Sequence, residues 1–389
     1  MKQCPILEIG TSKIICMLST ANRNGRNIPV SSYSDHDGIQ NGSFVDRGRT
    51  SAAIVSAVEE TEISSSYQIS RIICNVPGCF LKIEIRESTL GLSEDTVSEA
   101  DIERLKSMAA PVPYSDAVHI GTRYVYFIDS SGDIYIDPPV GARTSSISLC
   151  TAFYYAATEY TSLVESALEK LNIIVAAYIP DSFAQAMSYI PSEQRDRSAV
   201  LLNIGYSQTS VSAVYADAVI SEKTFYMGYS DIAGDIAIAL DTDMFTAYSI
   251  RKNHLFGSVP EPGALIYGKD STGKMAGFDA VKVKNAIEKR TRIIANEAER
   301  IIDGMSSLLQ AKAPVYLTGS DSNARGFSSF LSLLLGRPVI PVRQAKDMFS
   351  SDYNTSLALL DNAVLSLYDL NEELAERKPL KERIKDLFK

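Results

Sequence analysis

The sequence predicts an α/β fold made of two similar halves, with a smaller α+β unit inserted into the first half. The stretches ILEIGTSKII (6–15) and LLNIGYSQTS (201–210) share one pattern: apolar residues, a carboxylate or carboxamide, Ile-Gly, then small polar residues. After each stretch, short apolar runs alternate with helical patterns, which is typical of α/β layers. We therefore interpret the chain as a fold-level duplication with insertions in different places.

The first half begins with a strand, a Gly-centred turn and a second strand over CPILEIGTSKIICMLS (4–19). Ile54, Val55 and Val58 lie at helical spacing and predict an amphipathic helix, and ISRIICNVPG (69–78) then predicts a buried strand. A helix at 161–173 and a strand followed by a helix at 175–190 complete this half.

The composition changes between 84 and 152, where we expect the inserted unit. Ser98 and Asp101 have the spacing of a helix start, ahead of apolar Ile102 and Leu105. Two β-rich runs then flank a Ser-Ser-Gly-Asp turn, which predicts a hairpin.

The second half begins with a three-strand meander over 199–228. Helices are predicted at 230–240, 243–253 and, over a long stretch, 280–310. The segment 313–339 reads as a strand, a Gly-Ser turn and a helix, so a third Gly turn follows the strand VYLTG.

The repeated turn is suited to binding an anion, because glycine lets backbone N–H groups approach without a Cβ in the way. In the first copy Thr11 and Ser12 add hydroxyl donors, Lys13 adds positive charge, and Glu8 would hold a magnesium ion through water. One such turn is equally well a plain hairpin. The pair, with the third turn, favours a site where two loops clasp the phosphates of a nucleotide.

Bulk properties exclude several classes of protein. A net charge of −9 argues against a nucleic-acid binder, and 389 residues allow two or three domains. The 5 cysteines show no C-x-x-C, which fits reduced thiols in a cytoplasm, and the 3 histidines form no zinc or nucleophile motif. We identify no signal peptide and no apolar run of membrane-spanning length.

The order of these motifs resembles the actin/Hsp70/sugar-kinase ATPase superfamily and, more closely, the FtsA family of bacterial actin-like cell-division proteins. The stretch IGTSK matches the first phosphate loop of that family, and residues 133–156 match the segment where its inserted subdomain returns to the core. Residues 317–339 match its adenosine-side motif, and LKERIKDLFK resembles its membrane-targeting helix. The resemblance implies an actin-like ATPase fold, with two ribonuclease-H-like halves around a nucleotide cleft and an FtsA-type inserted α+β subdomain.

The resemblance also implies boundaries. The expected parts are a first core half at 1–83, 153–197 and about 353–370; an inserted subdomain at 84–152; a second core half at 198–229 and 312–352; its subdomain on the FtsZ-tail side at 230–311; a short linker at 371–378; and an amphipathic membrane-targeting helix at 379–389.

The implied cofactors are ATP and Mg²⁺, with no catalytic residue and no direct metal ligand assigned. The expected nucleotide-site residues are Glu8, Gly10, Thr11, Ser12, Lys13, Asn203, Gly205, Tyr206, Ser207, Gly228, Arg251, Gly319 and Ser320. Several depart from the family pattern. Glu8 replaces an aspartate, Asn203 replaces a carboxylate, and Tyr206 and Ser207 replace glycines. We therefore expect nucleotide binding with little or no hydrolysis.

Further departures lie on the adenosine side. Tyr229 and Ser320 each stand where a second glycine is common, and Tyr248 and Arg251 stand where Glu and Lys are usual.

The C-terminal stretch has the pattern of an amphipathic helix, for which Pro379 suits the first turn. Its apolar face carries Leu380, Ile384, Leu387 and Phe388, and basic residues lie beside it, namely Lys381, Arg383, Lys385 and Lys389. This composition favours a helix lying on an anionic membrane. A terminal helix packed on the protein body or exposed to solvent is the open alternative.

The family likeness implies an FtsA-like protein that tethers FtsZ filaments to the cytoplasmic membrane and polymerises like actin. Expected partners are the FtsZ C-terminal tail, further copies of the chain in a protofilament, anionic lipids, and later divisome proteins through the inserted subdomain. Arg290 falls at a family arginine of the FtsZ-tail site, although Ile293 replaces the usual glutamate. The expected location is cytoplasmic, peripheral on the inner face of the membrane at the division site.

Two alternatives remain. A pilus-assembly-type scaffold shares the inserted subdomain, and a sugar-kinase-like phosphotransferase shares the wider superfamily. The second needs an acid that serves as base near the γ-phosphate, and Glu8 and Asn203 disfavour it.

Overall fold

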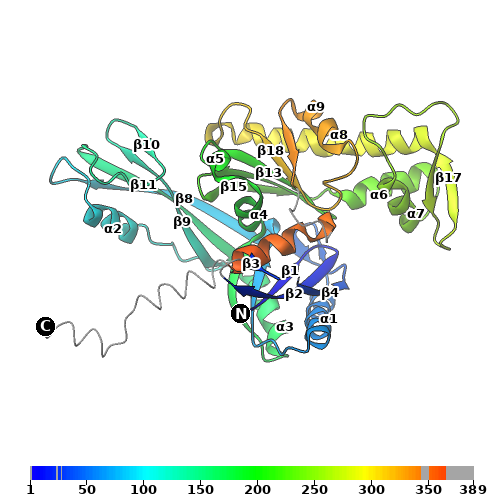
Figure 1. The fold of residues 1–389 in the computed structure, drawn as a ribbon, viewed down its shortest axis with the longest axis horizontal. Coiled ribbons are helices and arrows are strands. Elements are labelled where there is room, and N and C mark those ends of the chain that lie inside the picture. Colours follow the sequence, from blue (N-terminus) through cyan, green and yellow to red (C-terminus); the bar gives the residue numbers. More distant parts are fainter. Residues whose placement is uncertain (1, 23–24, 28, 343–349, 365–389) are drawn as a thin grey trace.

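The computed structural model describes residues 2–22, 25–27, 29–342 and 350–364. Figure 1 shows two α/β halves, one above the other, with a long sheet projecting to the left and a small hairpin at the right. Within these described ranges, no helix is long and apolar enough to cross a membrane. The predicted linker, the predicted C-terminal helix and residues 365–370 lie outside them.

The first half is built on a six-stranded sheet of order β12-β7-β1-β2-β3, with β4 also paired to β2. Its strands are β1 (Lys2–Ile9), β2 (Lys13–Asn22), β3 (Gly25–Arg26), β4 (Val30–Asp35), β7 (Arg71–Val76) and β12 (Ile174–Pro180). Side chains alternate between the two faces of a strand. Leu7 and Ile9 of β1 therefore pack against α1 (Arg47–Ser65) and α3 (Thr158–Glu169), while Ile6 packs against helical residues 354–364.

The inserted unit is an antiparallel sheet of order β10-β9-β11-β8 with one helix. Its elements are β8 (Leu81–Gly91), α2 (Glu99–Met108), β9 (Ala117–Asp129), β10 (Ile134–Tyr135) and β11 (Ser146–Ala157). The predicted helix start is confirmed. The amide of Asp101 donates to the Ser98 hydroxyl at 3.2 Å, and the amide of Ser98 donates to the Asp101 carboxylate at 3.0 Å.

The second half repeats the start of the first. Its five-stranded sheet has the order β15-β14-β13-β18-β19, with β13 antiparallel to β14 and parallel to β18. β1 is likewise antiparallel to β2 and parallel to β7, so the duplication extends to strand pairing. The strands are β13 (Ala199–Ile204), β14 (Thr209–Tyr215), β15 (Ala218–Phe225), β18 (Val315–Thr318) and β19 (Val339–Pro341).

Helices and short elements complete the fold. In the second half and its neighbours these are α4 (Asp181–Tyr189), α5 (Ser192–Arg195), α6 (Tyr229–Leu240), α7 (Met244–Lys252), α8 (Ala280–Gly304), α9 (Phe327–Leu335) and the hairpin of β16 (Leu265–Lys269) and β17 (Met275–Asp279). The remainder are the hairpin of β5 (Ile39–Gln40) and β6 (Ser43–Phe44), and the 3-10 turns η1 (Gly78–Phe80), η2 (Ser306–Leu308) and η3 (Ser351–Tyr353).

The edge strand β15 joins the second half to the rest of the molecule at two points. The Tyr154 hydroxyl of β11 donates to the carbonyl of Val219 at 3.1 Å and accepts from its amide at 2.9 Å. Gly78 lies so close to β15 that a Cβ there would collide with the Glu222 carboxylate and lie 2.7 Å from the Thr224 hydroxyl. The insertion is thus packed on the second half as well as being continuous with the first.

Candidate functional site

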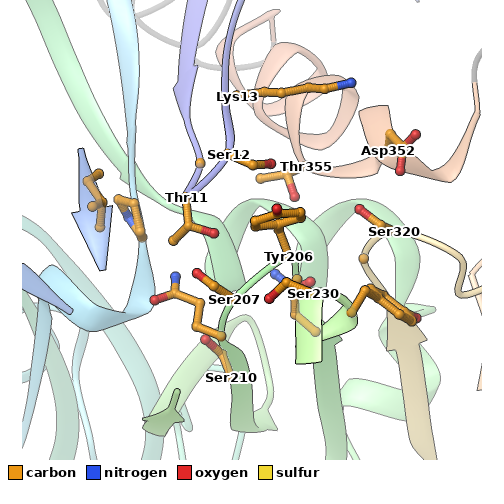
Figure 2. A pocket seen from close by; sticks show the side chains of 18 of the residues that line it. Thr11, Ser12, Lys13, Tyr206, Ser207, Ser210, Ser230, Ser320, Asp352 and Thr355 are labelled. Atoms are coloured by element: carbon orange, nitrogen blue, oxygen red, sulfur yellow. The ribbon is translucent and has the colours of Figure 1, made fainter. Parts of the chain in front are cut away.

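A cavity of about 1000 Å³ lies between the two halves and is lined by both Gly turns. In Figure 2 Thr11 and Ser12 lie on one side of it, and Tyr206, Ser207, Ser210 and Ser230 lie on the other. Of the predicted nucleotide-site residues, all but Gly228 line it; they are Glu8, Gly10, Thr11, Ser12, Lys13, Asn203, Gly205, Tyr206, Ser207, Arg251, Gly319 and Ser320. The volume suits a small-molecule ligand.

The two turns share one hydrogen-bond arrangement. The amide of Gly10 donates to the carbonyl of Lys13 at 2.9 Å, and the amide of Gly205 donates to the carbonyl of Gln208 at 2.9 Å. A Cβ on either glycine would lie 3.0–3.1 Å from that same carbonyl oxygen. The repeated sequence pattern therefore builds the same backbone turn twice.

Hydrogen bonds from Asn75 hold the strand end that leads into the first turn. The side-chain oxygen of Asn75, at the end of β7, accepts from the amide of Ile9 at 2.8 Å, and its nitrogen donates to the carbonyl of Ile9 at 3.2 Å. The same nitrogen also lies 2.9 Å from a carboxylate oxygen of Asp181, at the start of α4. Asn75 thus links the first turn to a second acidic residue of the cavity.

The N-terminus of α6 supports the second turn. The amides of Tyr229 and Ser230 donate to the carbonyls of Gly205 and Tyr206 at 3.0 and 2.8 Å. A Cβ on Gly228 would lie 2.5 Å from both carbonyl oxygens, so this residue lies behind the turn. Its glycine is needed for the close approach of helix and turn.

The third turn packs directly on the second half's first strand. Gly319 has φ +98°, and a Cβ there would collide with the carbonyl of Ile204. Two residues on, Asp321 forms an ion pair with Arg251 of α7. The Arg251 guanidinium also lies 4.5 Å from the ring centroid of Tyr229. Arg251 is therefore held inside the protein, although its Nε and Nη1 have no partner among the described residues.

Aromatic rings occupy positions where the resembled family usually has glycine, as at Tyr206 and Tyr229, or glutamate, as at Tyr248. The ring centroids of Tyr206 and Tyr248 lie 6.1 Å apart with 27° between the planes. Tyr206 is 38% exposed, so its ring forms part of the cavity wall and can be contacted by a ligand. The Tyr229 hydroxyl is buried without a partner in the described part of the chain.

Buried acidic side chains line the cavity from both halves. The Ser356 hydroxyl donates to the Glu8 carboxylate, and burial raises the pKa of Glu8 to about 7. Burial, with the nearby Glu8 charge, also holds the pKa of Asp181 well above its ordinary value. Burial likewise raises the pKa of Glu222. A cleft with protonated acids accepts an anionic ligand more readily than one with ionised acids.

Lys13 has a partner other than a phosphate in this structure: its ammonium lies 4.7 Å from the ring centroid of Tyr33. Across the described residues, no three or more His, Cys, Asp or Glu side chains come together as a metal cluster. Magnesium usually keeps several waters and needs few protein oxygens. Glu8 and Asn203, which both line the cavity, fit a water-mediated ion, with Glu8 the acid that would balance its charge.

Arg290, the predicted FtsZ-tail residue, lies on α8 and does not line the cavity. Its guanidinium makes two bonds to the Asp235 carboxylate of α6, at 2.8 and 2.9 Å. The hydrogen bond to Asp235 raises the pKa of Arg290. Arg290 therefore joins two helices of the second half, and a further ligand must share it or displace Asp235.

Sequence reasoning missed the residues that brace the first turn. His36, Asn75 and Ser356 contact the turn or its strand, and Asp181 contacts Asn75. The four residues come from four separate segments. Asp181 carries one usable signal, since it directly follows a strand of the parallel part of the sheet, and α/β proteins bind ligands outside the carboxyl ends of such strands.

Comparisons with known proteins agree with this geometry. The chain is 20% identical to the cell division protein FtsA of Pseudomonas aeruginosa over 348 residues, covering 86% of this chain and 81% of that protein. It is 20% identical to FtsA of Streptococcus pneumoniae over 347 residues, covering 88% and 73%. The chain is thus similar to FtsA proteins at a distance. No family model matches it.

Solved structures share the fold. A chain of the PilM-PilN type IV pilus biogenesis complex superposes with a TM-score of 0.59 at 16% identity, covering 93% of this chain and 98% of that one. MreB5 of Spiroplasma citri bound to ADP gives 0.54 at 9% identity, covering 95% and 99%. The predicted actin-like fold is confirmed by these neighbours.

Proposed function

We propose that this chain is an FtsA-like cell-division protein, an actin-like ATP-binding protein that joins FtsZ filaments to the membrane. One observation carries the nucleotide part: two turns of identical hydrogen bonding face one cavity from opposite halves. The similarity to FtsA proteins over most of both chains supports the cell-division part. An actin-like fold neighbour bound to ADP supports a nucleotide as the ligand.

ATP binds with its phosphates between the two turns, with magnesium held through water by Glu8 and Asn203. When bound, magnesium neutralises charge on the phosphates and orients them. The chain's own residues supply backbone N–H groups, the hydroxyls of Thr11 and Ser12, and a wall of aromatic rings. Since Asn203 is neutral and the pKa of Glu8 is about 7, the charge available for the metal is small. Turnover is therefore little or none.

Calorimetry of ATP binding with and without magnesium tests this site. Asn203→Asp restores a second carboxylate, and we expect it to strengthen magnesium-dependent binding about tenfold, because charge-assisted bonds are about twice as strong as neutral ones. Gln40→Glu is the matched control, since it adds the same charge elsewhere in the cavity lining. If the natural chain binds ATP tightly and Asn203→Asp does not change the affinity, the second turn does not face the phosphates.

The proposed membrane contact is the amphipathic segment 379–389, whose residues lie outside the described ranges. Leu387→Glu with Phe388→Glu places charge on the apolar face and is expected to abolish co-sedimentation with anionic liposomes. Lys381→Ala with Lys385→Ala lowers the charge by two as well but keeps the apolar face. This control should weaken liposome binding at low salt but should not abolish it, because the apolar face is intact. Full binding by the first variant would rule out the anchor.

The proposed partners follow from the same likeness. The FtsZ C-terminal tail binds near α8 and Arg290, further copies of the chain add end to end in a protofilament, and later divisome proteins contact the inserted sheet. The protein then works in the cytoplasm, peripheral on the inner face of the membrane at the division site. Co-sedimentation with FtsZ filaments, with and without the FtsZ tail, tests the central contact.

A second candidate is a scaffold in pilus assembly, favoured by the fold likeness to a chain of the PilM-PilN complex. The two functions differ in what they need. A pilus scaffold is not expected to need the amphipathic segment or the FtsZ tail. If the natural chain binds neither liposomes nor FtsZ, the pilus scaffold is favoured.

A further inference from the structure

Two carbonyls of the first turn, those of Gly10 and Ser12, are held by His36, which directly follows β4. Its ring Nε2 lies 2.8 Å from the carbonyl oxygen of Gly10. Its backbone amide donates to the carbonyl of Ser12 at 3.0 Å. His36 itself lines the cavity, so the contact lies beside the proposed phosphate position.

The neighbours of the ring fix its tautomer. The amide of Gly38 donates to Nδ1 at 3.3 Å, so Nδ1 carries no proton and Nε2–H donates to Gly10. Gly38 is itself closely packed, because a Cβ there would collide with the Thr50 hydroxyl of α1. Burial lowers the pKa of His36, which favours this neutral ring, while Asp35 and Asp37 act in the opposite direction.

Peptide geometry gives this bond a consequence. In a trans peptide the C=O and the following N–H point in opposite directions. Holding the Gly10 carbonyl against His36 therefore turns the Thr11 amide away from the ring, where it is free to meet an anion. Glycine tolerates the backbone angles of a flipped peptide, so without His36 the Gly10 carbonyl can turn and present a negative dipole instead.

The segment that follows His36 reaches the other half of the molecule. The turn of the β5–β6 hairpin has positive φ at Asn41 (47°) and Gly42 (72°). A Cβ on Gly42 would lie 2.7 Å from Cζ of Tyr226, which follows β15. The hairpin that follows His36 therefore contacts the second half.

We propose that His36 is a positioning residue of the nucleotide site, whose Nε2–H fixes the Gly10 carbonyl and so aims the first turn's amides at the phosphates. This inference rests on the proposed nucleotide binding. His36 touches the turn and need not touch the ligand. Its contribution is therefore to the geometry of the turn and, through the turn, to affinity.

Two substitutions separate the two ring nitrogens. The amide nitrogen of His36→Gln lies where Nε2 lies and keeps the donor to Gly10. His36→Asn keeps an acceptor near Nδ1 for Gly38 but cannot reach Gly10. Both remove the ring, so a purely structural role would affect them equally. The measurements are hydrogen exchange of the peptide covering 6–15 in the nucleotide-free full chain, and ATP affinity by calorimetry.

We expect His36→Asn to speed exchange in 6–15 and to weaken ATP binding about five- to tenfold, the size of one lost hydrogen bond. His36→Gln should stay within about twofold of the natural chain in both measurements. Equal effects of the two variants, or faster exchange without loss of affinity, would overturn the positioning role. If the natural chain binds no ATP, the proposed nucleotide site is wrong, and the positioning role fails with it. If the natural chain binds ATP and His36→Asn speeds exchange without weakening that binding, the nucleotide site stands and only the positioning role is wrong.

Discussion

Glu8 is the residue at which the proton balance of the site is decided. Its carboxyl lies in the cavity wall, accepts a hydrogen bond from Ser356, and has a pKa raised by burial from an ordinary 4.5 to about 7. Because the folded pKa lies above the unfolded one, the folded chain takes up a proton. The stabilisation is complete below pH 4.5 and is lost as pH rises through about 7.

We expect the free energy of unfolding of the natural chain to fall between pH 4.5 and 7 relative to Glu8→Gln, by about 3 kcal/mol at most. Urea unfolding at a series of pH values measures this difference. Glu94→Gln, at an exposed carboxyl of the insertion, is the control and should run parallel to the natural chain. Parallel curves for Glu8→Gln as well would mean that the pKa of Glu8 is the same in the folded and the unfolded chain.

The same residue predicts how magnesium acts. Only the ionised form of Glu8 balances a cation, so magnesium-dependent ATP affinity should rise between pH 6 and pH 8, whereas magnesium-free affinity should not rise. Calorimetry at the two pH values gives both quantities. An increase of equal size without magnesium would assign the effect to another group.

Among the elements, α6 and α8 are joined by the pair of Asp235 and Arg290, in which both side chains are partly exposed. We expect Asp235→Asn to release Arg290 and to strengthen binding of an FtsZ-tail peptide about three- to tenfold, because Arg290 no longer has an internal carboxylate. Its stability cost should be about 1 kcal/mol or less. Fluorescence anisotropy of a labelled peptide measures the affinity.

Arg290→Ala should weaken the same peptide, and Glu297→Gln, which opens the pair with Arg300 on the same helix, should leave it unchanged. If neither Asp235→Asn nor Arg290→Ala moves the affinity, the tail does not use this part of α8.

The elements also show how far sequence reasoning extends. The turns at Gly10 and Gly205 and the start of α2 at Ser98 depend on residues a few positions apart, so their local patterns predicted them correctly. The contact of Glu8 with Ser356 spans 348 residues and exists only after the chain has folded. Arg290 was placed by family likeness alone, which carried no sign of its partner Asp235.

At the scale of the whole molecule, Tyr154 fastens the insertion to the second half. Tyr154→Phe removes both bonds to Val219 and leaves a buried amide and carbonyl unpaired. We expect a loss of about 1–3 kcal/mol in the free energy of unfolding. Tyr124→Phe, in which a ring that is 44% exposed loses its hydroxyl, should cost much less. Equal costs in urea unfolding would show that the Val219 contact contributes no more than a surface hydroxyl.

Gly78 lies where the first half, the insertion and the second half meet. It lies where β7 leaves the first half for β8 of the insertion, and at that point the backbone rests on Glu222 and Thr224 of β15. Gly78 itself lines the cleft. The long strands β8, β9 and β11 of the insertion extend to the left in Figure 1. A rotation of the two halves about Gly78 that narrows the cleft therefore also displaces the far end of the insertion relative to one of the halves, by a distance that grows with the length of its strands.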